Sequence, residues 1–269
     1  MRYQKFPPHK DLGPFVECYY VWQGEARTLL DVQSPAFGYC AMVFNYGDTY
    51  KAYQNKEEVK VVPRAFISGQ FTSNFHLLMK GVISTVGIVF KPTAPNYFFG
   101  IRMSHLVNNR MALSLLLDKE IDKLLPAIKH QATDTKRVEI LENFLLSRLS
   151  EAKSHLSIVD EAVEFIDINQ GCSTVDEVAT YLKVSRRYLE KKFLETVGVS
   201  PKFYARIKRF GILSNRISHS EKIDWQQIVF EHGFHDQSHL AKEFTEFNKM
   251  NPSTYVMLHN EMTRFLKKR

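Results

Sequence analysis

The N-terminal part of the chain, up to about Phe99, alternates short apolar runs with turn-forming residues. The runs are rich in Val, Ile, Phe and Tyr, and turn formers such as residues 45–48 and Gly69 separate them. Short runs with this punctuation indicate antiparallel strands closed into a sandwich or a small barrel. We therefore predict an antiparallel β-barrel with strands at Phe15–Gln23, Tyr39–Tyr46, Ala65–Gly69, Asn74–Met79 and Ser84–Phe90.

From Met111 onward the hydrophobic pattern becomes helical. Leu115–Ile128 and Thr135–Leu149 carry apolar residues three and four positions apart, the spacing of one helix face. We expect the second helix to pack through that stripe on the barrel or on a second subunit, with packing inside one chain favoured. The stripe consists of Val138, Leu141, Leu145 and Leu149.

A polar stretch at residues 151–155 divides the helical connector from the pattern that follows, as is typical of a domain boundary. A chain of 269 residues also exceeds the usual size of one domain. We expect an α+β chain with a β-barrel at residues 1–110, a helical connector that can supply dimerisation helices at 111–153, and an all-α domain at 154–269.

Helix-start signals recur in the last part of the chain. Ser157, Thr174 and Asp224 each stand three residues before a side chain that can reach back to the amide of the cap residue. Two further helices are predicted where a capping side chain precedes a proline, because the first helical position needs no N–H. These starts are Ser200-Pro201 and Asn251-Pro252.

The same part of the chain contains an internal repeat with an offset of 51 residues. Each copy contains a cap, a helix with Leu and Phe four positions apart, a short turn and a helix that starts with proline. The matched pairs are Ser185 with Asp236, Leu189 with Leu240, Phe193 with Phe244, Pro201 with Pro252 and Tyr204 with Tyr255.

A short helix precedes each copy, and the turns at residues 183–185 and 232–235 are as tight as those of a helix-turn-helix. Gly233 can take the left-handed conformation that such a turn needs. The second helix of a helix-turn-helix enters the DNA major groove, and two such helices engage successive grooves when they lie roughly 34 Å apart. The helix from Pro201 to about Ile217 would span about 25 Å and can act as the spacer.

The repeat and its linker closely resemble the DNA-binding domain of AraC/XylS-type transcription regulators over about Ser157–Tyr255. Two residues depart from the family pattern. Lys249 stands where the family usually ends the second recognition helix with glycine, and Val256 stands where an arginine often follows the tyrosine. The resemblance rests on residues 184–193, 198–201, Tyr204, Gly233-Phe234, 236–240, Phe244 and 252–255.

The N-terminal half more loosely resembles the small cupin-like sensor domains of the same family, chiefly at Gly87–Pro92. The two resemblances together imply a bacterial, cytoplasmic transcription regulator that acts as an activator. They imply double-stranded DNA and RNA polymerase as partners, with a small-molecule effector in the barrel and a homodimer as further options. No cofactor, metal or catalytic residue is implied.

The resemblance also assigns roles to individual positions of the two recognition helices. Arg and Lys donate to guanine, Gln suits adenine and Glu accepts from cytosine, whereas phosphate contacts position the protein without reading sequence. The base-reading set is Arg187, Glu190, Lys191, Gln237, Ser238 and Lys242. The phosphate set is Arg186, Lys192, Lys202, Arg206, Lys208 and His239. For any one of these residues, a plain surface charge is the alternative.

Aromatic and apolar side chains are assigned mostly to packing. Trp22, Phe44 and Tyr46 are candidates for lining a barrel pocket, although aromatic residues in so small a barrel mostly form core. The predicted core of the helical domain is Leu189, Phe193, Leu240, Phe244, Trp225 and Ile228.

Charge supports a polyanionic partner only locally. The chain has 36 basic and 29 acidic residues, a net charge of +7 and a pI near 9.2. The segment Arg186–Arg216 contains nine basic and only two acidic residues. On charge it is therefore the candidate segment for binding DNA, with a solvated helix face as the alternative. The apolar stretches are too short to cross a bilayer and the N-terminus lacks a signal-peptide core, so no membrane partner is expected.

Two other function classes stay open. A cupin-like barrel can be a metal enzyme, but such sites need about three clustered His or carboxylate ligands, and the four N-terminal-half histidines, His9, His76, His105 and His130, are isolated. The three cysteines form no CxxC, and His232, His235 and His239 straddle a turn without a fourth ligand. The other alternative is a protein-interaction module whose helix-turn-helix units have lost DNA binding.

Overall fold

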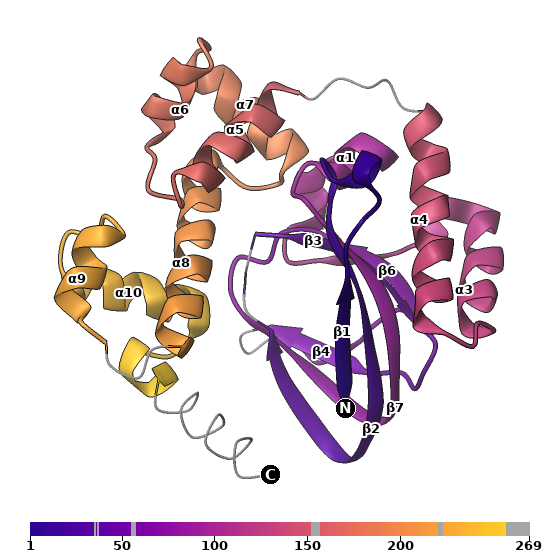
Figure 1. Cartoon of the computed structure of the whole chain (residues 1–269). Helices are drawn as coiled ribbons and strands as arrows, with labels where there is room; N and C mark the ends of the chain where they lie inside the picture. The colour runs from indigo at the N-terminus through magenta and orange to yellow at the C-terminus, as the bar shows by residue number, and fades with distance from the viewer. Residues whose placement is uncertain (35, 37, 55–57, 152–156, 220–222, 257–269) are drawn as a thin grey trace.

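The computed structural model describes residues 1–34, 36, 38–54, 58–151, 157–219 and 223–256. An N-terminal sheet domain and a C-terminal helical domain lie side by side (Figure 1). Helices α3 and α4 cover the sheet on one side, and the helical units stack along α8 on the other. The strands are β1 Arg2–Phe6, β2 Val16–Ser34, β3 Cys40–Asn45, β4 Lys51–Gln54, β5 Lys60–Val61, β6 Ala65–Ser68, β7 Phe75–Phe90 and β8 Arg110–Ala112.

The sheet is antiparallel and open, so the predicted closed barrel is wrong. Its main path runs β1-β2-β7-β3-β6-β8, and β4 with β5 attaches to the other half of β7. The strands predicted at Asn74–Met79 and Ser84–Phe90 are one bent strand, because Gly81 takes a φ of 85° within β7 and the strand continues past it. β2 follows this bend, with a register shift between Ala26 and Leu30.

One face of the sheet carries the larger core of this domain. The stripe predicted on the connector helix packs there within the chain, because Val138, Leu141 and Leu145 are buried among sheet residues such as Phe44 and Phe90. A second cluster, which includes Tyr50, Phe66 and Met79, lies on the opposite, concave side. The helices of this part are α1 Ala94–Phe99, α2 Ser114–Leu117, α3 Ile121–Lys129 and α4 Asp134–Glu151.

The predicted helix starts of the C-terminal domain are confirmed. Ser157 and Thr174 form capping boxes with Asp160 and Glu177, and Asp224 accepts from the amides of residues 226 and 227. The expected return contact of Gln227 is absent, because its side chain donates to Glu231 at 2.7 Å. The helices are α5 Ile158–Ile168, α6 Val175–Tyr181, α7 Arg186–Thr196, α8 Pro201–His219, α9 Trp225–Glu231 and α10 Gln237–Asn248, and residues 252–256 are also helical.

Each helix-turn-helix unit has its own core, and α8 contributes to both. Leu189 and Phe193 are buried between α5, α6 and α7, together with Tyr204 of α8. Leu240 and Phe244 pack with Ile207 and Phe210 of α8 in the second unit. Trp225 is partly buried against this second cluster. The repeat seen in the sequence therefore corresponds to two packed units on one shared helix.

Hydrogen bonds, ion pairs and a cation–π contact join the sheet domain to the helical domain, and one of them links Arg102 Nη2 to Glu195 Oε1 of α7 at 3.9 Å. The Thr93 hydroxyl donates to Asp160 at 2.5 Å, at the start of α5. At the end of α10, the backbone N–H of Asn74 donates to Phe247 O and its side-chain amide donates to Asn248 O, both at 2.9 Å. Lys208 of α8 lies 3.1 Å from Asp167 and 4.8 Å from the ring centre of Tyr39.

The predicted boundary falls largely on residues 152–156, outside the described residues. Among the described residues, no helix combines the length and apolarity that a bilayer crossing requires.

Lys249 ends α10 in the left-handed conformation, with φ of 58° and its N–H bonded to Thr245 O at 2.9 Å. The cap that glycine usually provides therefore forms with a lysine. A left-handed non-glycine residue costs about 1 kcal/mol, so we expect Lys249→Gly to raise the free energy of unfolding by about that amount in urea denaturation. Lys249→Ala removes the same amine without relieving the strain, and an equal gain in that variant would contradict this explanation.

Candidate nucleic-acid interface

Helix α7 presents a polar face opposite its buried one. Leu189 and Phe193 point into the core, so the face with Arg187, Glu190 and Lys191 points away from it. The Ser185 hydroxyl fixes the start of this helix by accepting from the Tyr188 N–H at 3.2 Å. Arg187 and Lys191 are exposed, and neither makes a hydrogen bond or an ion pair with another described residue. Their charges are available to a partner.

Glu190 and Arg186 are paired with each other on the same helix. The Arg186 Nε lies 3.0 Å from Glu190 Oε1, and its Nη1 lies 3.3 Å from Asp176 Oδ2 of α6. All three side chains are largely exposed, and such surface pairs contribute about 1 kcal/mol or less. A phosphate or a base edge could therefore replace either contact at low cost.

Helix α10 repeats this arrangement in the second unit. Asp236 caps it by accepting from the His239 N–H at 2.7 Å. Gln237, Ser238 and Lys242 are exposed on the first turns, while Leu240 and Phe244 are buried. The repeat offset superimposes Lys242 on Lys191 of α7. Two recognition helices thus expose equivalent positions.

A groove of about 670 Å³ lies between the two units and collects residues from both. It is bounded by the start of α6, by α8 and by α10. The groove contains five of the residues predicted to contact DNA: Arg186, Lys202, Arg206, His239 and Lys242. Lys202 is exposed at the start of α8, and His239 Nδ1 accepts from the His235 N–H at 3.3 Å.

Arg206 belongs to a buried ion cluster that sequence reasoning missed. Glu243 of α10 is 3% exposed, and its carboxylate lies 2.8 Å from Arg206 Nε and 2.8 Å from Arg209 Nη2, both on α8. Arg206 also reaches Glu246 at the groove surface. This cluster ties the second recognition helix to α8. The predicted phosphate contact of Arg206 therefore competes with two carboxylates inside the domain.

Two other members of the phosphate set lie away from this groove. Lys208 has a side chain only 12% exposed, lodged between Asp167 and Tyr39 at the sheet domain. Burial is the main cause of the raised pKa of Asp167, and the Lys208 ammonium opposes it. Lys192 is half-buried on α7, 3.4 Å from Glu195. In this arrangement Lys208 serves the contact between the two domains.

Of the three candidate pocket residues, only Trp22 lines the cavity on the concave side of the sheet domain. Phe44 is fully buried in the main core, on the opposite face of the sheet. Tyr46 lines a separate hollow and its hydroxyl accepts from Gln23 at 2.8 Å. Strand register explains why Trp22 and Phe44 lie on opposite faces: they pair with Thr85 and Val86, and successive side chains of β7 point to opposite faces.

No group of three or more His, Cys, Asp or Glu side chains with metal-site geometry occurs among the described residues. His232 is buried, whereas His235 and His239 are exposed. The three do not converge on one point.

Comparison with known sequences finds a family match for two segments of the chain. Residues 178–257 match the family described as a helix-turn-helix domain. Residues 4–112 match a family described as a domain of unknown function (DUF6597). The second match spans the sheet from within β1 to β8.

Among curated proteins, the lactose operon transcription activator of Staphylococcus xylosus is 31% identical over 98 residues. The match covers 36% of this chain and 35% of that protein, so the chain spans about a third of its curated relative. Among solved structures, ToxT from Vibrio cholerae with an unsaturated fatty acid has a TM-score of 0.48 at 14% identity, over 88% of this chain and 94% of that one. The C-terminal domain of AraT from Geobacillus stearothermophilus has a TM-score of 0.36 at 24% identity, over 39% and 88%.

Glu243→Gln should destabilise the second unit strongly. The change leaves two arginines in a largely buried site without their shared carboxylate, and breaking a buried pair costs about 3 kcal/mol or more. Glu246→Gln is the matched control, because that carboxylate also contacts Arg206 but is 47% exposed and should cost under about 1 kcal/mol. Urea denaturation measures the free energy of unfolding of both variants. Equal losses in the two variants would show that the buried carboxylate contributes no more to stability than the exposed one.

Acidification should weaken the second unit through His232. Burial, followed by the positive charge of Arg216, lowers the pKa of His232 below its usual 6.5, and neither ring nitrogen has a hydrogen-bond partner among the described residues. As the pH falls below 6.5, His232 is protonated more readily in the unfolded chain than in the folded chain. The contribution of neutral His232 to stability is therefore complete above pH 6.5 and declines as the pH falls towards the folded-state pKa. His232→Gln should flatten the pH dependence of thermal unfolding below neutrality. His235→Gln, an exposed control, should leave it unchanged.

Proposed function

We propose, from the premise that residues 178–257 form a helix-turn-helix domain of the AraC type, that this chain is a sequence-specific DNA-binding transcription regulator. It reads two successive major-groove segments of one duplex and activates transcription. One observation carries the proposal. Helices α7 and α10 occupy equivalent positions in two repeats, bury equivalent Leu and Phe side chains and expose polar faces.

The spacing between the two helices supports engagement of one DNA face. They are joined by the 19-residue helix α8, which spans about 28 Å at 1.5 Å per residue. Recognition helices on successive grooves lie about 34 Å apart. A rigid connection of this length has the right order of magnitude for two readers one helical turn apart.

Base reading is assigned to the exposed faces of α7 and α10. Arg187 and Lys191 can donate to guanine O6 and N7. Neither side chain forms an ion pair with another described residue. Gln237 can pair with adenine, and Ser238 and Lys242 lie beside it. Glu190 can accept from cytosine once it leaves Arg186.

Phosphate contacts are assigned to the residues that border this surface. Arg186, Lys202 and His239 line the groove between the units, and Lys192 lies on α7. Arg206 and Lys208 are left out, because their charges are engaged by Glu243 and by Asp167. The remaining contacts should give the salt dependence expected of phosphate neutralisation.

Control by the N-terminal domain is supported by its contacts with both units. Asn74 bonds to the end of α10, and Thr93 bonds to the start of α5. A change in the sheet domain can therefore alter the freedom of either unit to seat on DNA. The neighbouring ToxT structure contains an unsaturated fatty acid, which supports a small-molecule effector as the regulating signal.

Activation as the outcome is supported by the Staphylococcus xylosus relative, the lactose operon transcription activator. An activator works through RNA polymerase, which makes the polymerase the second macromolecular partner of this proposal. A homodimer would bring two pairs of readers to adjacent half-sites. A regulator of this kind acts in the bacterial cytoplasm.

Charge reversal on α7 tests the proposal directly. Selection of bound fragments from a random DNA pool should return two short preferred blocks about one helical turn apart. Arg187→Glu and Lys191→Glu should each lower affinity for the selected site by at least about tenfold, since a bidentate base contact is worth about 1–3 kcal/mol. Fluorescence anisotropy at fixed salt measures this loss. Lys129→Glu, the same change on the exposed face of α3, should leave affinity unchanged.

Three results would count against DNA reading. The first is a single preferred block, and the second is uniform weak binding that disappears with salt. The third is full cellular activity in the Arg187→Glu and Lys191→Glu variants, which would favour a protein-interaction module.

A further inference from the structure

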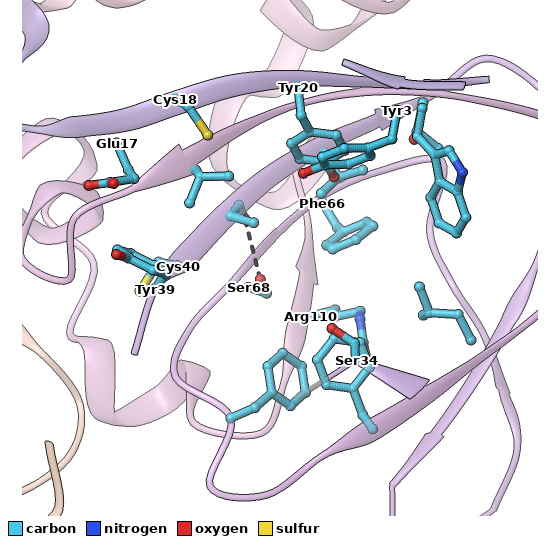
Figure 2. A pocket seen from close by; sticks show the side chains of 18 of the residues that line it. Tyr3, Glu17, Cys18, Tyr20, Ser34, Tyr39, Cys40, Phe66, Ser68 and Arg110 are labelled. Atoms are coloured by element: carbon cyan, nitrogen blue, oxygen red, sulfur yellow. Dashed lines mark hydrogen bonds between the residues drawn. The ribbon is translucent and has the colours of Figure 1, made fainter. Parts of the chain in front are cut away.

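The concave side of the sheet domain encloses a cavity of about 460 Å³ (Figure 2). A cavity of this size accommodates a small organic molecule. Aromatic side chains form much of its wall, among them Tyr20, Trp22, Tyr50 and Phe66. The bend in β2 and β7 creates the hollow, because both strands run through it and carry lining residues on each side of the bend.

Arg110 is placed in this cavity by strand pairing. It lies on β8 directly opposite Ser68 of β6, so the two side chains share one face of the sheet with Phe66. Ser68 and Phe66 both line the cavity. The intervening residue Met111 points to the other face, against the main core. The edge strand β8 thus delivers a single cation to the cavity wall.

The surroundings of Arg110 are apolar. Its guanidinium carbon lies 4.5 Å from the ring centre of Phe75, 4.6 Å from that of Phe71 and 6.0 Å from that of Phe66. Its Nη2 atom is buried and has no hydrogen-bond partner among the described residues. Burial lowers the pKa of Arg110 to about 10, so the group is still charged at neutral pH.

The cavity contains no counterion for this charge among its described lining residues. Glu17 carries the one carboxylate of that lining, and it is exposed near Cys18 and Tyr39, apart from Arg110 (Figure 2). An unpaired charge in an apolar site is costly, and the folded chain leaves the Nη2 donor unused. Cation–π contacts with the rings of Phe71 and Phe75 offset only part of this cost.

We propose that the cavity binds a small organic monoanion, with a carboxylate on the Arg110 guanidinium and an apolar or aromatic body against the surrounding rings. This inference rests on the proposed function for its role as effector site. The guanidinium fork matches a carboxylate in two parallel hydrogen bonds. One buried cation balances one negative charge, so a dianion such as a phosphate monoester is disfavoured.

The far end of the same cavity touches the helical domain. Gly38 and Tyr39 line the cavity, and both lie against α8. A Cβ atom added to Gly38 would lie 3.1 Å from Lys208 Cδ, and the Lys208 ammonium group lies over the ring of Tyr39. A guest that shifts this segment would change the packing of the helix shared by the two recognition units. Binding in the cavity and binding of DNA are therefore expected to be coupled.

Titration calorimetry on the full chain without DNA tests the site. Benzoate and octanoate are the probes, benzamide and octanamide are their neutral counterparts, and phenyl phosphate is the dianion. At least one acid should bind at least about tenfold more tightly than its amide and than phenyl phosphate. Equal binding of acid and amide, or no acid binding below about 1 mM, would overturn the proposal.

Variants separate a ligand role of Arg110 from a packing role. Arg110→Gln should reduce acid binding to the level of the amide, while Arg110→Lys retains part of it. Lys5→Gln, the other cation in the lining, is exposed and should bind acid normally. Without ligand, the melting temperature of Arg110→Gln should equal or exceed that of the wild type. A lower melting temperature together with unchanged acid binding would show that Arg110 serves packing and does not bind the ligand. Because DNA is absent, failure here leaves the operator-binding result intact.

Discussion

The geometry of the DNA-reading half depends on one buried carboxylate. Glu243 is held between Arg206 and Arg209, and these three side chains add charge-assisted hydrogen bonds to the apolar packing of α10 on α8. Hydrogen bonds are directional, so the cluster favours one rotation of α10 about its own axis. That rotation decides which of its side chains face outward. The surface assigned to DNA is therefore a consequence of an interaction on the opposite face of the same helix.

Helix α8 connects all the parts of the molecule. Its first turns pack in the core of one unit through Tyr204, and its later turns pack in the core of the other through Phe210. Between them, Lys208 contacts Tyr39 of the sheet domain and Asp167 of α5. A disturbance at the sheet can therefore reach the shared helix at Lys208, and it can also reach the end of α10 and the start of α5, which Asn74 and Thr93 contact. This arrangement suits a regulator, since one helix can transmit a signal to two DNA-contacting surfaces.

Local signals in the sequence were sufficient for the helical half and insufficient for the sheet. Caps, prolines and the Leu/Phe spacing depend on neighbours within a few residues, and the predicted helix starts are confirmed. Closure of the sheet depends on pairing between distant strands, and a short apolar run cannot show that Gly81 bends a strand and does not end it. The same limit explains the candidate site. Exposed faces of α7 and α10 follow from periodicity, whereas the partners Arg206 and Glu243 are 37 residues apart, and Arg110 follows only from its register with Ser68.

The two units are copies of one pattern, but they are not interchangeable. The residue that corresponds to Glu243 in the first copy is Lys192, which pairs with Glu195 instead. Placing the α7 sequence at the position of α10 would put the Lys192 ammonium group against the two guanidinium groups of α8, and like charges in a poorly solvated place repel strongly. Helix α7 therefore cannot take the place of α10 without loss of this ion cluster. Under the proposed function, the two units would contact the double helix through different surfaces, so that a single molecule could distinguish upstream from downstream.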